Sequence, residues 1–238
     1  MKKQITILLL LLLAASASAQ NRPYIDDKPV HFGFSLGVNF MHYSVKDSEL
    51  PINGEIYHAR MSSMLPGFSV GFIADVRLSR HLNLRFCPGM HFGERTLTYK
   101  SESGNPIPVL DRSHRPDQNS VLCIPISVPL YLKWSAEREI NYRPYLIAGG
   151  GISYDFNQNK DRTDLLQRPF DFFVEVGSGC DFYFNWFKLC PQLTYSIGFN
   201  NVLTPTQNKV DWTPLNPLYT DAISRLLNRQ ITLTFNFE

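Results

Sequence analysis

Long apolar runs are missing from this chain after its first 20 residues, which excludes a bundle of membrane-spanning helices, since each needs about 20 consecutive apolar residues. Charge is also sparse, because only 18% of the 238 residues are Asp, Glu, Lys or Arg. Basic residues number 23 and acidic residues 21, so no excess positive charge points to nucleic acid as a partner. The apolar fraction of 44% in turn excludes a disordered protein.

The N-terminus has the layout of an export signal. Lys2 and Lys3 precede an apolar stretch at 5–13, and the small residues at 17–19 form a cleavage site before Gln20. An anchoring helix would need about 20 apolar residues, more than this stretch provides. The sequence therefore predicts a cleaved signal peptide at 1–19, a periplasmic leader at 20–29 and a β-barrel at 30–238.

The rest of the chain alternates between apolar and polar residues. From Val30 to Phe40 every even position is apolar and every odd position is polar or glycine, which is the period of a β-strand with two unlike faces. The same alternation predicts eight strands in all, at 30–40, 67–78, 82–93, 121–134, 144–155, 170–184, 187–199 and 231–238. Their length suits tilted strands that cross a membrane, which need about 9–11 residues.

The connections between these strands are long and short in turn. Long ones are expected at 41–65, 100–120, 156–169 and 200–230, and short ones at 79–81, 135–143 and 185–186. Outer-membrane barrels have this order, with long external loops, short periplasmic turns and an even number of strands. We therefore expect an all-β, eight-stranded, antiparallel, up-and-down transmembrane β-barrel in the outer membrane of a Gram-negative bacterium, with outer-membrane lipid as its surroundings.

A soluble barrel with an apolar interior has the same alternation, so the direction of the two faces decides between the models. Nearly all of the 17 phenylalanines fall on the apolar face, and the lumen of an eight-stranded barrel is too narrow to hold them. Most of the 14 glycines fall on the polar face, as a narrow lumen requires. These counts favour aromatic residues facing lipid, with glycine and charge inside.

Two local patterns modify this model. Proline cannot donate a hydrogen bond to the sheet, so bulges or strand ends are expected at Pro88, Pro125, Pro129, Pro144 and Pro191. Apolar residues with helical spacing predict a short helix within 219–227, packed under the rim of the barrel.

The polar face carries charges of both signs that would lie in the lumen. Asp75 falls opposite Arg85 across the tight turn, which predicts a cross-strand ion pair. A path for protons or ions is the alternative, but lumens of this size are usually filled, which favours structural pairing. The expected structural network is Asp75, Arg77, Arg85, Lys133, Glu175, Asp181 and Lys188.

No residue pattern points to a metal, a cofactor, a small-molecule substrate or catalysis. The six histidines have no spacing that gathers three metal ligands, and Asp111, Ser113 and His114 in an expected loop match no catalytic motif. An exported protein can form disulfides. The expected strand positions nevertheless disfavour pairing Cys180 with Cys190, or Cys87 with Cys123.

Four segments resemble the PorT family of outer-membrane β-barrels, which is associated with type IX protein secretion and gliding motility. They are DKPVHFGFSLGVNF at 27–40, LCIPISVPLYLKW at 122–134, RPYLIAGGGISYD at 143–155 and ISRLLNRQITLTFNFE at 223–238. The resemblance implies a barrel that acts with the outer-membrane translocon to export proteins bearing a sorting domain, and it brings no catalytic residues.

Three functions are therefore compared. A non-enzymatic secretion component that binds translocon subunits through its loops or periplasmic face is favoured, because a filled barrel cannot itself pass a protein. A general small barrel that serves as an adhesin or envelope scaffold is the alternative. An enzyme acting at the loops is the third.

Overall fold

The computed structural model describes residues 28–48, 51–52, 54–104, 118–156, 165, 167–184, 186–204 and 218–238. The expected signal peptide, the leader up to residue 27 and the loop residues Asp111–His114 lie outside these ranges. Within them lie eleven strand segments: β1 (Val30–Asp47), β2 (Tyr57–Met64), β3 (Pro66–Arg77), β4 (Leu82–Phe86), β5 (Gly89–Ser101), β6 (Gln118–Cys123), β7 (Pro125–Ser135), β8 (Tyr142–Asp155), β9 (Phe170–Tyr183), β10 (Lys188–Gly198) and β11 (Ile223–Phe237), with one short helix, α2 (Leu218–Asp221), before β11.

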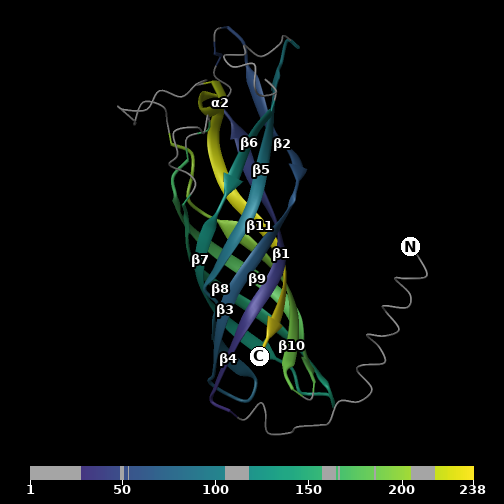
Figure 1. Ribbon diagram of the computed structural model, residues 1–238. Coiled ribbons are helices and arrows are strands. Elements are labelled where there is room, and N and C mark those ends of the chain that lie inside the picture. The colour runs from purple at the N-terminus through teal and green to yellow at the C-terminus, as the bar shows by residue number, and fades with distance from the viewer. Residues whose placement is uncertain are drawn as a thin grey trace, which may run out of the picture.

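The segments form a closed antiparallel barrel (Figure 1). β1 pairs with β11 on one side and with β3 on the other, and β10, β9, β8, β7 and β4 complete the ring. We call the end with α2 and the long connections the loop end, and the end with the short turns and the C-terminus the turn end. The eight-stranded, up-and-down antiparallel barrel expected from the sequence is confirmed.

Three of the eight strands are each interrupted once. Breaks at Leu65, at Cys87–Pro88 and at Ile124 divide the second, third and fourth strands into two segments each. Proline lies at all three breaks, because Pro88 is inside one, and Pro66 and Pro125 begin the segments after the other two. The strand ends expected at Pro88 and Pro125 are present. Pro129, Pro144 and Pro191, where bulges or strand ends were also expected, lie inside continuous strands.

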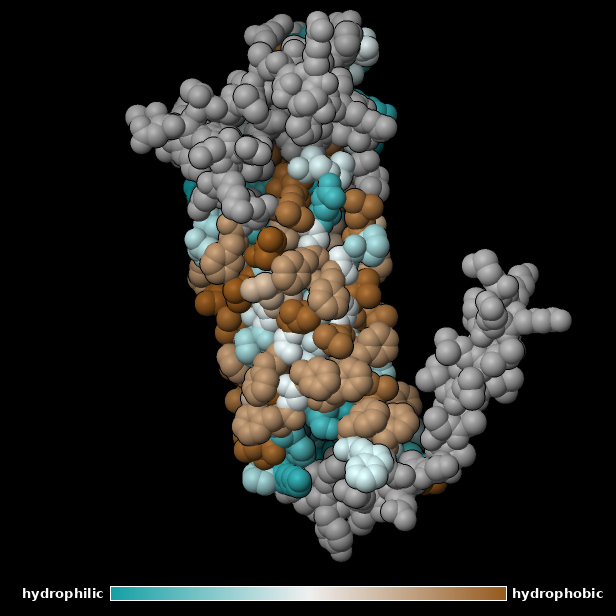
Figure 2. All heavy atoms as spheres, viewed as in Figure 1, coloured by the Kyte–Doolittle hydropathy of each residue, from teal (hydrophilic) through white to brown (hydrophobic). Residues whose placement is uncertain are grey.

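The outer wall of the barrel is apolar (Figure 2). Phe32, Phe34 and Phe72 each expose about half of their surface or more. Polar residues and glycines point inward, and at Gly149 the neighbouring strand comes so close that an added Cβ would lie 2.1 Å from the carbonyl oxygen of Leu130. This arrangement is that of a transmembrane barrel with its aromatic side chains in lipid.

The two faces exchange polarity near the loop end. In β1 the outward residues are apolar up to Phe40, after which His42 points outward while Met41 and Tyr43 are buried inside. The register pairs His42 with Arg229, so the outward surface turns polar on both strands at the same height. We infer that the hydrocarbon layer ends here and that the strands continue into water.

This reversal explains why several sequence-predicted loops were too long. The connection expected at 41–65 is largely strand, because β1 continues to Asp47 and β2 begins at Tyr57. For the same reason β5 reaches Ser101, β6 begins at Gln118 and β11 begins at Ile223 instead of residue 231. The expected strand boundaries assumed that apolar residues always face outward.

The helix predicted within 219–227 is present only in part, at 219–221. Helix α2 ends at Asp221, and the chain continues as strand from Ile223. Ser224 is an extra residue opposite the Lys46/Asp47 step, and its hydroxyl donates to the carbonyl oxygens of Lys46 and Asp47. This β-bulge turns both Ile223 and Leu226 inward, so that residues three apart share a face and imitate helical spacing.

In the part of the chain that the structure describes, no helix has both the length and the apolarity needed to cross a membrane.

Candidate functional site

The lumen has three levels, which follow one another from the turn end to the loop end. An ion network lies at the turn end, a polar cavity lies above it, and a cluster of apolar side chains lies at the loop end. We call them the ion network, the chamber and the cap core.

The ion network is centred on Arg85 and comprises Asp75, Arg85, Lys133, Asp181, Lys188 and Glu238. Arg85 Nη2 lies 2.8 Å from Asp75 Oδ2, and the two residues pair in the register of β3 and β4. The same nitrogen lies 2.5 Å from Oε1 of Glu238, the last residue of the chain. These three side chains expose at most 1% of their surface, so the cross-strand pair predicted from the sequence is present and fully buried.

Two lysines extend the ion network. Lys133 Nζ lies 2.6 Å from Asp181 Oδ2, and Lys188 Nζ lies 2.5 Å from Glu238 Oε2. The ammonium of Lys133 also lies 4.1 Å from the centre of the Tyr145 ring. Each cation thus has a carboxylate partner, as burial of charge requires. Matched charges block this end of the lumen.

Two of the sequence-predicted charges lie outside the ion network. Arg77 lies nearer the end of β3 and is partly exposed. Glu175 lies further toward the loop end on β9, where its carboxylate accepts hydrogen bonds from Tyr131 and Thr194. The structure therefore brings five of the seven predicted residues together.

Sequence reasoning missed three members of this site. Asn83 donates to Asp75 Oδ1 over 2.6 Å, and Gln192 Oε1 accepts from the Tyr145 hydroxyl over 3.1 Å. Glu238 was missed although the alternation of β11 places every second residue from 232 to 238 on the polar face. That alternation could have identified Glu238 as a lumen residue.

The chamber lies between the ion network and the cap core. Strands β5 and β7 to β11 all contribute to its wall, together with the segment at 167–169. Its polar lining includes His91, Arg95, Ser127, Gln167, Asp171 and Glu175. A second cavity nearer the turn end shares His91, Ser127 and Glu175 with it, so polar space continues toward the ion network.

Hydrogen bonds hold His91 in the middle of the lumen. Its Nδ1 lies 2.8 Å from Ser69 Oγ, and its Nε2 lies 2.8 Å from Ser127 Oγ. In the Ser-His-Asp template a carboxylate accepts from the second ring nitrogen, and a serine hydroxyl occupies that place here. The arrangement is typical of a structural hydrogen-bond network.

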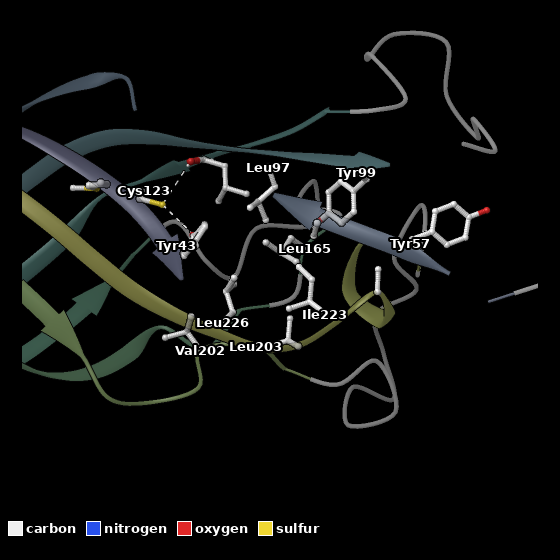
Figure 3. Close-up of a cluster of buried hydrophobic side chains, with 14 residues drawn as sticks. Tyr43, Tyr57, Leu97, Tyr99, Cys123, Leu165, Val202, Leu203, Ile223 and Leu226 are labelled. Atoms are coloured by element: carbon white, nitrogen blue, oxygen red, sulfur yellow. Dashed lines mark hydrogen bonds between the residues drawn. The ribbon is translucent and has the colours of Figure 1, made fainter. Parts of the chain in front are cut away.

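The cap core closes the loop end above the chamber (Figure 3). Tyr43, Leu97 and Leu226 belong to it and are almost completely buried. Beneath them Arg95 lies 4.6 Å from the centre of the Tyr43 ring, at the border with the chamber. Apolar packing above and ion pairs below thus bound the two ends of the polar cavity.

Metal and disulfide chemistry have little support in this geometry. Among the described residues, no group of three or more His, Cys, Asp or Glu side chains is placed to hold a metal ion. All four cysteines are free thiols, at positions 87, 123, 180 and 190.

A family model agrees with the barrel architecture. A family model described as "Outer membrane protein beta-barrel domain" matches residues 18–204. No curated protein matches the chain. Among solved structures, Neisserial surface protein A is 11% identical over 88% of this chain and 98% of its own, with a TM-score of 0.43. The outer-membrane protein AlkL is 13% identical over 87% of this chain and 90% of its own, with a TM-score of 0.39.

Proposed function

We propose that this chain, which belongs to the outer membrane β-barrel domain family, is a non-enzymatic component of protein export that acts by contact with other proteins. It is an outer-membrane protein of a Gram-negative bacterium. The single observation that carries the proposal is the blocked lumen, in which Arg85, Asp75 and Glu238 are paired and buried at the turn end. A barrel filled in this way offers no path to a polypeptide, so we expect it to act by binding other proteins through its surfaces.

The export pathway is proposed to be type IX secretion. The support is the resemblance of four segments, including 27–40 and 223–238, to the PorT family. The partner is then the outer-membrane translocon or another protein of that system, bound at the loops or the periplasmic turns.

Deletion of the gene is expected to abolish surface delivery of proteins that carry a type IX sorting domain. The measurement is immunoblotting of such a protein in cell-surface, medium and periplasmic fractions, where it should accumulate in the periplasm. Re-expression of the full chain should restore delivery. As a control, the amounts of other outer-membrane barrels should not change. Normal delivery in a clean deletion strain would contradict the proposal.

A general adhesin or envelope scaffold is the second candidate. The observation in its favour is the cap core, which holds the strands together beyond the apolar belt and presents the long connections outside the cell. Exchange of the connections at 48–56 and 102–117 for those of a related barrel would then change adhesion and leave export intact. The export proposal predicts no change in adhesion.

A further inference from the structure

The chamber contains two charges of opposite sign, a buried arginine and a partly buried glutamate, that do not pair with each other. Arg95 on β5 and Glu175 on β9 both line this cavity. Among the described residues, neither side chain forms an ion pair, in contrast to every charge of the ion network below. An uncompensated buried charge costs several kcal/mol, so Arg95 without an ion-pair partner calls for a physical reason.

Arg95 presents an unused hydrogen-bond donor at the loop end of the chamber. Its Nη1 donates to Asn228 Oδ1 over 3.0 Å, while its Nε has no acceptor among the described residues. Gln167 adds a second donor, because its Oε1 accepts from the Tyr43 hydroxyl and its Nε2 is buried without an acceptor. Both residues are almost completely buried, at 4% and 2% exposure. Two unpartnered donors mark a place for a carboxylate.

Glu175 presents the opposite charge further toward the turn end. Its hydrogen bonds come from the side chains of Thr194 and Tyr131, which are neutral. These donors orient the carboxylate and leave its charge uncompensated. A positively charged group of a ligand in the chamber would compensate the charge of Glu175.

The remaining charged residues of the chamber bear on the charge of its ligand. Asp171 accepts from the backbone N–H of Asn200 and from the Asn228 amide, and Asp155 accepts from the backbone N–H of Ile124. Three arginines, Arg95, Arg168 and Arg229, line the chamber together with the three carboxylates Asp155, Asp171 and Glu175, so the lining carries both signs in equal number and suits a ligand that also carries both.

We propose that the chamber binds a small zwitterion of the α-amino-acid class. The ligand carboxylate bonds to Arg95 Nε and Gln167 Nε2, and the ligand ammonium lies toward Glu175. Arg168 lines the same cavity and is itself exposed to solvent. The proposal concerns binding alone and does not depend on a role in export. The sequence predicts no small-molecule ligand. The expected strand ends at residue 93, so Arg95 is not expected to point into the lumen.

The test is isothermal titration calorimetry of the purified, folded protein in detergent micelles with three probes: glycine, acetate and methylammonium. Glycine should bind saturably, and each of the two half-ligands should bind at least about tenfold more weakly, since one charge contact is then lost. Acetate binding as tightly as glycine would overturn the proposal in favour of an anion site. Absence of saturable glycine binding would also overturn it.

Two matched substitutions locate the site. Glu175→Gln keeps the size and hydrogen-bonding groups of the side chain and removes its charge, so glycine affinity should fall about tenfold or more. Glu137→Gln makes the same change at an exposed turn and should leave affinity unaltered. Arg95→Gln should abolish binding, and Glu175→Gln carries the test if that variant does not fold. Equal affinity in Glu175→Gln and the native protein would overturn the proposal.

Discussion

Replacement of Arg85 by leucine should lower the free energy of unfolding of the barrel by about 3–5 kcal/mol. The substitution leaves Asp75 and Glu238 buried at the turn end without the guanidinium that both contact. Urea unfolding of the protein in lipid vesicles, followed by the electrophoretic mobility of folded and unfolded forms, measures the change.

Arg80 provides the control for this experiment. Its ion pair with Glu137 spans 3.6 Å and is about three-quarters exposed, so Arg80→Leu should change stability by less than about 1 kcal/mol. Adding Asp75→Asn to Arg85→Leu should recover part of the loss, because Asp75 is then no longer an unpaired charge and Glu238 keeps Lys188 as its partner. Equal effects of Arg85→Leu and Arg80→Leu would contradict the structural role of the ion network.

Replacement of Phe72 by arginine should destabilise the inserted barrel by about 2–4 kcal/mol, the cost of a cation near the middle of the bilayer. Phe72 points outward from the middle of β3, and its ring is 49% exposed on the apolar belt. The same vesicle-based urea titration measures the loss.

Leu122 is the matched control, with 53% of its surface exposed. It pairs in register with Glu94, just beyond the outward apolar residue Phe92, and therefore lies where the outer face turns polar. Leu122→Arg should cost only about 0–1 kcal/mol. A cost equal to that of Phe72→Arg would show that the apolar belt extends further toward the loop end than the reversal of polarity indicates.

The barrel could be predicted from the sequence because its alternation is strict wherever one face meets lipid. Within the belt, β1 from Val30 to Phe40 keeps one parity throughout, and so the strand and its direction were correct. Beyond Phe40 the strand keeps alternating between its inner and outer face, but the outer face now meets water instead of lipid. The apolar residues therefore lie on the inner face. Sequence reasoning that links apolar residues to the outer face ends each strand at this border.

The candidate site was predictable in part for the same reason. Asp75 and Arg85 lie on neighbouring strands joined by a tight turn, which fixes their register, and their ion pair was predicted correctly. Arg95 was missed because it lies in the region of reversed polarity, and Gln167 because it comes from a connection between strands. Contacts such as that between Arg85 and Glu238 link residues far apart in the chain, and no local pattern determines them.

Lipid contact of the outer wall tests the central claim most directly. Nuclear magnetic resonance of the protein in lipid vesicles can detect cross-peaks between the protons of the lipid acyl chains and those of individual side chains. The account predicts strong cross-peaks to Phe34 and Phe72 and none to Thr194 and Thr232, which line the lumen. Acyl-chain cross-peaks to the two threonines, with none to the two phenylalanines, would contradict it.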